Sequence, residues 1–180
     1  MCYNKNMNKE VEQPITIERN TKAYYSTTSL LKKYGYNYQV IVLKKDIIEA
    51  NKTISTELNI PLASNVYEIK RLVIVEGKPK AIETSFIAAE LIPDFYSVNI
   101  ENKPLYTVLN DKYNIQIDKS EERIIVTEAT KSERELLSLK DELDVMVING
   151  NSGDKTGRIV ELYQTVAVYD FFEFKGVNLN

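Results

Sequence analysis

Residues 67–87 read YEIKRLVIVEGKPKAIETSFI, and no other stretch says as much about the fold of this chain. Two runs rich in β-branched and aromatic residues, Val66–Val75 and Ala81–Ile87, are separated by the segment Glu76–Pro79, which contains a glycine and a proline. Apolar runs of this length on either side of a short Gly-containing loop are typical of a β-hairpin. We therefore predict two antiparallel strands joined by a tight loop.

Arg71 lies inside the first of these strands. Strand alternation places it on one face with Ile69, Val73 and Val75, so its guanidinium points toward an apolar surface, where a charge needs a partner. If the hairpin loop has three residues, Arg71 lies opposite Glu83 on the second strand. Such a pair is either a structural ion pair within the sheet or a clamp for an anionic or polyol ligand in a pocket. The pattern leaves both interpretations open.

Short strands and helices alternate along the rest of the chain. Apolar or alternating runs predict strands at Tyr38–Leu43, Glu122–Thr130, Leu143–Ile148 and Arg158–Val168, with Phe171–Phe174 as a continuation of the last. Cap signals and apolar spacing predict helices at Ser26–Tyr34, Asp46–Leu58 and Pro104–Tyr113, and a fourth helix that a capping box of Ser132 and Glu135 opens and that runs through Leu139. Asn149–Asp154 is rich in glycine and polar residues and is predicted to be a loop.

These elements predict an α+β fold, with a mainly antiparallel sheet and short flanking helices. The length of 180 residues and the absence of an internal linker predict one domain, residues 15–180. Residues 1–14 are polar and rich in asparagine and lysine, and we expect them to form a disordered lead-in.

Composition excludes several classes of function. The chain has no histidine, which removes Ser-His-Asp and Cys-His catalysis and His-ligated zinc. Its single cysteine, Cys2, excludes an intrachain disulfide and favours a cytoplasmic protein. A net charge of -3 argues against direct binding of nucleic acid, and no apolar run approaches the roughly 18 residues of a membrane span. We predict neither a metal site nor a cofactor.

Glu161 raises the same question as Arg71. It shares a strand face with Ile159, Tyr163, Thr165 and Ala167, where small and hydroxylated side chains surround its carboxylate. That carboxylate could accept hydrogen bonds from the hydroxyl groups of a ligand, or it could pair with a lysine.

Hydroxylated side chains at Ser26, Thr27 and Thr28 open the first predicted helix. A helix N-terminus offers free N–H groups and the positive end of the helix dipole, which together favour phosphate. Ordinary N-capping needs only one of these hydroxyls and is the simpler interpretation.

The order and spacing of these elements resemble those of the UTRA effector-binding domains of GntR/HutC-family transcription regulators. In that signature, a strand with two alternating arginines leads through a Gly-x-Pro hairpin to a strand that carries glutamate. Residues 67–87 here resemble it, with one of the two arginines, Arg71. Three further stretches are similar to family segments: SLLKKYGYNYQVIVL at 29–43, KPLYTVLNDKYN at 103–114 and GRIVELYQTVAVYDFFEF at 157–174. The resemblance covers about Ile15 to Val177.

The resemblance implies a chorismate-lyase-like fold that binds a small-molecule effector, such as a sugar, a phosphosugar or an amino-acid-like metabolite. It also implies a homodimer, and an effect on DNA through a winged helix-turn-helix. By position, the family's ligand contacts correspond to Arg71, Glu83 and Glu161, and its phosphate loop meets the first helix at Ser26, Thr27 and Thr28.

The chain departs from the family pattern at positions that hold phosphate. Val73 stands in place of the second arginine, Pro104 in place of a serine, and Ala167 and Val168 in place of a Tyr-Arg pair. The anion site is therefore depleted, which argues against a phosphorylated ligand. Too few residues precede Ile15 to form a winged helix-turn-helix, so we expect contact with DNA only through an attached or partner domain.

The leading prediction is a ligand-sensing regulatory domain without enzymatic activity. One alternative is a chorismate-lyase-like enzyme on the same fold, in which only Arg71, Glu83 and Glu161 offer an acid or a base. The other is a dimerisation module with a non-functional pocket. The fold alone does not distinguish these three functions.

Overall fold

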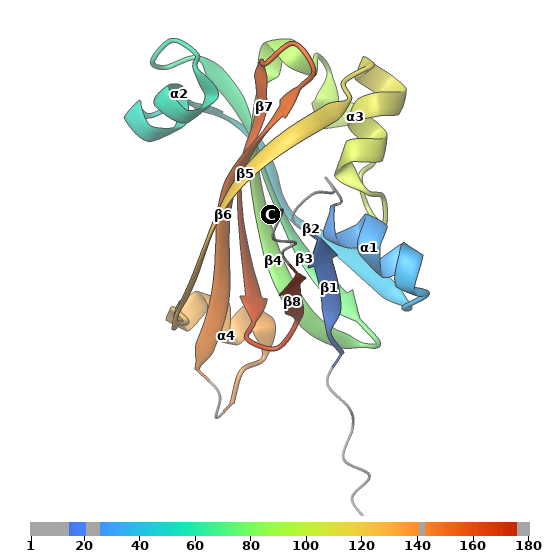
Figure 1. Ribbon diagram of the computed structural model, residues 1–180. Coiled ribbons are helices and arrows are strands. Elements are labelled where there is room, and N and C mark those ends of the chain that lie inside the picture. Colours follow the sequence, from blue (N-terminus) through green and yellow to red (C-terminus); the bar gives the residue numbers. More distant parts are fainter. Residues whose placement is uncertain (1–14, 21–25, 141–142, 176–180) are drawn as a thin grey trace, which may run out of the picture.

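A six-stranded antiparallel sheet forms the body of the computed structural model, which describes residues 15–20, 26–140 and 143–175. The strand order is β2 (Tyr38–Glu49), β3 (Asn65–Val75), β4 (Lys78–Ala88), β7 (Ile159–Val168), β6 (Asp144–Asp154) and β5 (Ile117–Glu128). Figure 1 shows these long strands running through the height of the molecule. The predicted α+β class with a mainly antiparallel sheet is confirmed, whereas the predicted lead-in, 1–14, lies outside the described residues.

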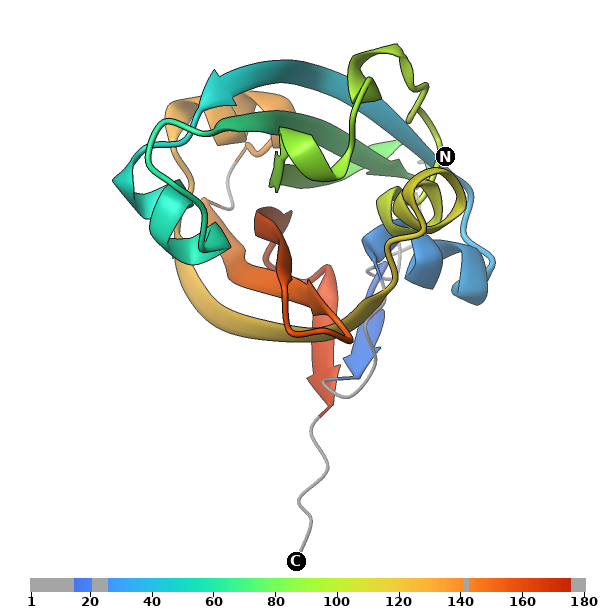
Figure 2. The same cartoon turned by 90° about the horizontal axis from the view of Figure 1, so that it is seen from above.

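Four helices and two 3-10 turns in the described residues flank the sheet. They are α1 (Thr27–Tyr34), α2 (Lys52–Leu58), α3 (Leu105–Tyr113), α4 (Lys131–Leu137), η1 (Ala89–Leu91) and η2 (Phe95–Ser97). Viewed from above, the sheet curls around an interior, and α1 and α3 lie on the side that it leaves open (Figure 2). The curl gives the sheet an inner and an outer face.

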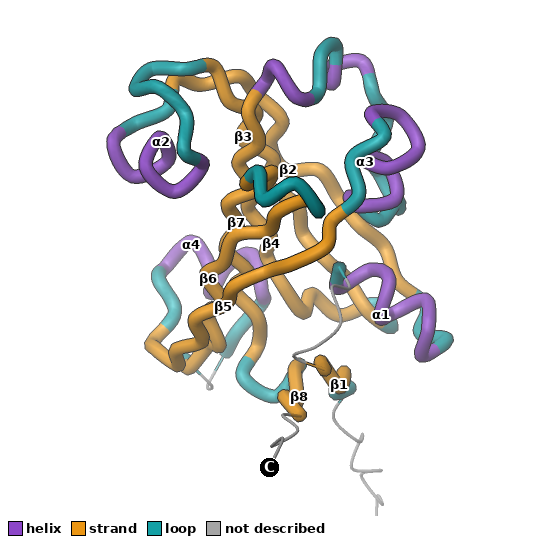
Figure 3. The backbone as a smooth tube through the Cα atoms, turned by 45° about the horizontal axis from the view of Figure 1, so that its top comes forward, coloured by secondary structure: helices purple, strands orange, loops and turns teal. Residues whose placement is uncertain are grey.

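The first and last described strands form a separate ribbon. β1 (Ile17–Asn20) pairs in parallel with β8 (Phe172–Lys175), with Ile17 opposite Phe172. Figure 3 shows the two side by side. We call this pair the terminal ribbon. The run at 171–174 is therefore not a continuation of β7, because its backbone bonds go to β1.

The central hairpin has the predicted register but a shorter turn than predicted. The turn has two residues, Glu76 and Gly77, both with positive φ (49° and 75°), which is the backbone that a two-residue hairpin turn requires. A β-bulge follows, because Val73 pairs with Ala81 while Ile74 pairs with Pro79. The predicted three-residue loop was wrong, because the turn has two residues. The bulge adds one residue to β4, and Arg71 therefore still lies opposite Glu83.

The predicted start of the second helix, at Asp46, was wrong. Strand β2 continues through Glu49, and Asn51 caps α2 by accepting a hydrogen bond from the backbone N–H of Ile54 at 2.9 Å. Pairing with β3 continues from Asp46 to Glu49 and satisfies the backbone there, and Ile47 is half exposed rather than part of a buried helical stripe. Strand pairing therefore overrides the apparent helical spacing.

Two further boundaries were misplaced. The capping box of α4 is Thr130 with Glu133 rather than Ser132 with Glu135, so the helix begins two residues earlier than predicted. The expected loop at Asn149–Asp154 belongs to β6, which pairs with β5 on one side and β7 on the other. Two neighbouring strands supply the hydrogen bonds that its glycine-rich sequence does not suggest.

Apolar clusters cover both faces of the sheet. On the inner face, one cluster lies under α3 and the 3-10 turns and contains Ile69 and Ile87, and a second lies under α1 and the terminal ribbon and contains Val73 and Ala81. On the outer face, α4 and α2 each cover a cluster of their own. The residues between the two inner clusters are therefore shielded from water at both ends.

The turn between β6 and β7 is organised by the carboxylate of Asp154. It accepts hydrogen bonds from the hydroxyl and backbone N–H of Thr156, at 2.5 and 2.9 Å, and from the guanidinium of Arg158, at 2.8 and 3.1 Å. The hydroxyl of Thr156 makes the largest contribution to a pKa of about 2 for Asp154, below its ordinary value of 3.8.

We expect Asp154→Asn to lower the Tm at pH 7 by roughly 3–6 °C, because the amide loses charge-assisted hydrogen bonds. Since the folded state depresses this pKa, the stabilisation is present above pH 3.8 and is lost as the pH falls toward 2. The Tm difference between the parent and the variant, measured by differential scanning fluorimetry, should therefore shrink on acidification. Asp118→Asn, at an exposed position of β5, serves as the charge control. A pH-independent difference would contradict the assignment.

Candidate functional site

Buried polar side chains lie on the inner face between the two apolar clusters. Arg71 pairs with Glu83 across β3 and β4, and Glu83 pairs with Thr165 of β7. We call the following group the inner polar cluster: Arg71, Glu83, Ser85, Ser152, Glu161 and Thr165, all of which are less than a tenth exposed. Burial of charged groups is costly unless they are paired, so the cluster constrains the fold around it.

Arg71 makes the ion pair that the sequence predicted. Its Nη2 lies 2.6 Å from Oε2 of Glu83, and its Nη1 donates to the backbone oxygen of Lys103 at 3.3 Å. The side chains of the pair are 3% and 9% exposed. The buried Nε of Arg71 has no hydrogen-bond partner among the described residues. The role of Arg71 and Glu83 as ligand contacts stays a prediction.

Glu161 is held by hydroxyl groups. Its Oε2 accepts from the hydroxyl of Tyr106 at 2.8 Å and from that of Ser152 at 3.3 Å, and the hydroxyl of Ser85 is also bonded to the carboxylate. The partners shown for Glu161 in the described part of the chain include no lysine, and its role as a contact for the hydroxyl groups of a ligand stays a prediction. Burial raises the pKa of Glu161, and these hydrogen bonds and the charge of Arg71 lower it by less.

Two members of the site were missed from the sequence. Tyr106 comes from α3, and its position over the sheet depends on helix packing that strand periodicity does not predict. Ser152 was assigned to a loop, so its face could not be predicted, whereas the structure places it opposite Glu161 on β6. A correct strand assignment of 144–154 would have found it.

Of the three hydroxylated residues at the first helix, Ser26 acts as the cap. Ser26 is the N-cap of α1, and its side chain accepts from the backbone N–H of Ser29 at 3.3 Å. Its hydroxyl also lies 3.2 Å from that of Thr28, while Thr27 and Thr28 are both buried. No hydrogen bond shown for the described residues joins them to the inner polar cluster. A phosphate site at this helix stays a prediction.

The described residues show neither a metal site nor a membrane-spanning helix. They contain no group of three Asp, Glu, Cys or His side chains able to hold a metal ion. Among the helices at 26–140, none is long and apolar enough to span a membrane. The arrangement is suited to binding, through a guanidinium, two carboxylates and several hydroxyls.

The sequence pattern of the UTRA domain family matches residues 33–173. The chain belongs to the UTRA domain family. The predicted resemblance is thereby confirmed, with element order and spacing as its main basis. The matched range contains Arg71, Glu83 and Glu161 and begins after the hydroxylated residues of α1.

Known proteins similar to this UTRA domain include transcription regulators. A probable fructoselysine utilization operon transcriptional repressor of Escherichia coli (strain K12) is 24% identical over 98 residues, which are 52% of this chain and 40% of that protein. The crystal structure of PhnF from Mycobacterium smegmatis has a TM-score of 0.82 at 18% identity and covers 91% of this chain and 72% of that chain. The effector domain of the same protein has a TM-score of 0.81 at 17% identity, covering 90% of this chain and 100% of that one. This chain thus spans less than half of the curated relative.

We expect Arg71→Met to destabilise the domain by about 3–5 kcal/mol, because it leaves Glu83 buried without its partner. The double variant Arg71→Met with Glu83→Leu should recover more than half of that loss, since it removes both charges and keeps apolar volume. Urea unfolding followed by circular dichroism measures both differences. Arg134→Met, which removes an exposed ion pair with Glu128, is the control and should change little. A double variant no more stable than the single one would contradict the structural pair.

Proposed function

We propose that this UTRA domain is the effector-sensing part of a transcription regulator of the GntR/HutC type. A small metabolite binds at the inner polar cluster and changes the affinity for DNA of a winged helix-turn-helix in an attached or partner domain. The observation that carries the proposal is the cluster itself. A buried guanidinium and two buried carboxylates on one sheet face are expensive to maintain, and ligand recognition gives a reason for retaining them.

The names of the similar proteins support this proposal. The Escherichia coli protein is named as a probable transcriptional repressor of a fructoselysine utilization operon, and the Mycobacterium smegmatis structure is named as an effector domain. Both names are consistent with metabolite sensing coupled to transcription. They favour a binding role over a catalytic one for this chain.

The charge balance of the cluster favours an uncharged or amine-bearing ligand, such as a sugar or an amino-acid-like metabolite. Arg71 is already neutralised by Glu83 at 2.6 Å, whereas the partners shown for Glu161 are hydroxyls. A phosphate would add two negative charges to a site that already holds one carboxylate more than it holds guanidinium groups. Desolvated charges of like sign repel strongly, so phosphosugars fit less well.

We expect a metabolite to be retained after gentle purification and identified by native mass spectrometry. It should raise the Tm of the parent and of the control Arg134→Met. It should not raise the Tm of Arg71→Met or Glu161→Gln, because recognition needs both the planar donors and the carboxylate. A ligand that stabilises Arg71→Met as much as the parent would overturn the site, and a phosphorylated ligand would overturn the proposed class. Turnover of chorismate by the chain would favour an enzyme instead.

We also propose that the domain forms a homodimer through β5. This edge strand exposes Ile124, Ile125 and Val126, by 39, 40 and 53%. A groove of about 790 Å³ lies beside it on the outer face, between β5 and α2. An exposed edge with consecutive apolar side chains is a site for association unless it is covered.

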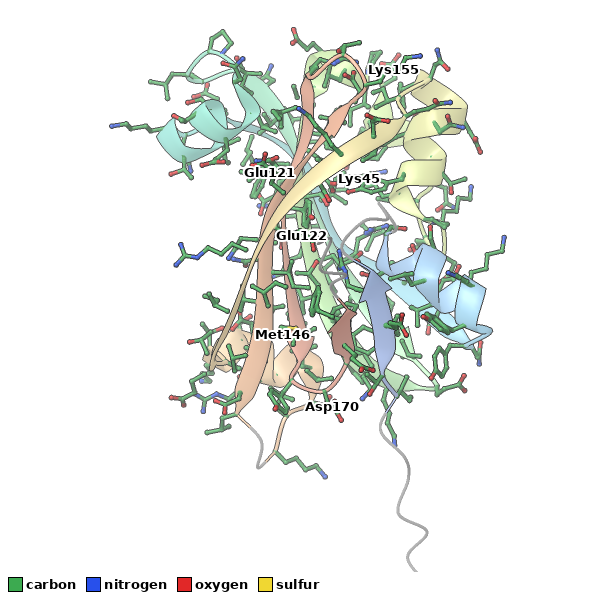
Figure 4. All side chains as sticks on the ribbon, viewed as in Figure 1. Lys45, Glu121, Glu122, Met146, Lys155 and Asp170 are labelled. Carbon is green, nitrogen blue, oxygen red and sulfur yellow. The ribbon has the colours of Figure 1, made fainter. Side chains whose placement is uncertain are left out.

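The opposite edge of the sheet differs. The segment at 98–102 lies along β2, where the side chain of Asn102 accepts from the backbone N–H of Val40 at 2.8 Å. Lys45 donates to the backbone oxygen of Val98 at 2.9 Å and lies over the rings of Phe95 and Tyr96 (Figure 4 labels Lys45). One edge is therefore partly covered from within the chain, which leaves β5 as the better surface for a second copy.

Light scattering should give the mass of a dimer at micromolar concentration. Val126→Lys should shift the mass toward monomer, because a charge within the exposed apolar run opposes burial. Ile47→Lys, which makes the same kind of change at the half-exposed Ile47 of β2, is the matched control and should stay dimeric. A parent that is monomeric at all concentrations, or equal effects of the two variants, would refute the β5 interface.

A further inference from the structure

One carboxylate oxygen joins three strands that are distant in sequence. Oε1 of Glu122, on β5, accepts a hydrogen bond from the hydroxyl of Tyr163, on β7, at 2.6 Å, and it forms an ion pair with the guanidinium of Arg19, on β1. The side chains of Arg19 and Glu122 are only 13% and 18% exposed. Figure 4 labels Glu122 and its neighbour Glu121 on β5.

Arg19 belongs to the terminal ribbon. Its guanidinium lies 5.2 Å from the ring centroid of Phe172 and 5.8 Å from that of Phe174, both on β8. Cation–π contacts of this kind hold a guanidinium against a flat aromatic surface. The ribbon shares no ladder of backbone hydrogen bonds with the six-stranded sheet. Its link to Glu122 is therefore a side-chain connection between two separate sheets.

Tyr163 belongs to the inner face. It pairs with Ser85 across β4 and β7, and it shares the strand face of Glu161 and Thr165, so it borders the inner polar cluster. A Cβ atom at Gly150 of β6 would come within 2.7 Å of the Tyr163 ring, which shows how closely the ring packs on that backbone. Burial raises the pKa of Tyr163, and the charges of Glu122 and Glu161 raise it further. Its hydroxyl therefore stays protonated and acts as a donor.

We propose that Tyr163 connects the inner polar cluster to the terminal ribbon by holding Glu122 in place to bind Arg19. Glu122 stands on an edge strand, where Arg19 and the Tyr163 hydroxyl are the two partners shown for its carboxylate, so loss of the hydroxyl leaves Arg19 as the one that holds it. A ligand in the cluster that engages or displaces Tyr163 then changes how firmly β1 is held. This regulation rests on the proposed function, and it acts on β1, the first strand that the structure describes.

Hydrogen–deuterium exchange of the full chain, read by mass spectrometry, tests the connection without any ligand. Glu122→Gln should speed the exchange of amides at 17–20 about three- to tenfold, because one charge-assisted contact is lost. Glu121→Gln makes the same change one residue away, on the outer face, and should leave that exchange unchanged. Equal effects of the two variants would overturn the proposal.

Tyr163→Phe tests whether the inner polar cluster is connected to the terminal ribbon. It keeps the ring over Gly150 and removes only the hydroxyl, so the fold is retained. We expect faster exchange at 17–20, comparable to that of Glu122→Gln, and no further increase in the double variant, because both changes break the same chain of contacts. Exchange at 17–20 that is unchanged in Tyr163→Phe would make Arg19–Glu122 a structural tether alone and would overturn the proposal. Such a failure would leave effector binding untouched, and a failure to find an effector would not alter these exchange rates.

Discussion

The burial of the Arg71 guanidinium is the constraint around which this domain is organised. A charge that is 3% exposed must be compensated, and Glu83 does this from the adjacent strand at 2.6 Å. The register that brings the two together depends on the bulge after the hairpin turn. The two inner apolar clusters shield the pair from water at both ends of the sheet, which strengthens its attraction and also raises the cost of leaving it incomplete.

Glu161 shows how the same shielding affects the proposed effector site. Its hydroxyl partners come from three different elements, since Ser85 lies on β4, Tyr106 on α3 and Ser152 on β6. Hydroxyls lower the cost of burying a carboxylate without neutralising its charge. The proposed site is thus organised in advance and holds one carboxylate more than it holds guanidinium groups, a combination that suits the recognition of hydroxyl and amine groups better than that of phosphate.

Strand register relates the site to the surface of the molecule. Glu122 on the edge strand β5 and Tyr163 on β7 lie in one cross-strand row on either side of Gly150, which has no side chain to separate them. Arg19 on β1 binds the same carboxylate, so a surface strand, the inner face and the terminal ribbon share one contact. The same strand exposes its apolar residues to solvent. Strand β5 therefore stands between the proposed effector site and the proposed partner subunit, and each could influence the other through it.

The sequence by itself determined the fold class, the central hairpin, the face of Arg71 and the family, because strand alternation and turn residues are local signals. It misplaced the ends of β2 and β6, where pairing with neighbouring strands outweighs local preference for a helix or a loop. Ser152 faces Glu161 through the register of β6 and β7, which a strand assignment of 144–154 would have predicted. Only the tertiary structure brought Tyr106 to Glu161, and Arg19 to Glu122 and Tyr163. These contacts join residues 41 to 103 positions apart, and the helix packing and the strand order that create them leave no periodic trace in the chain.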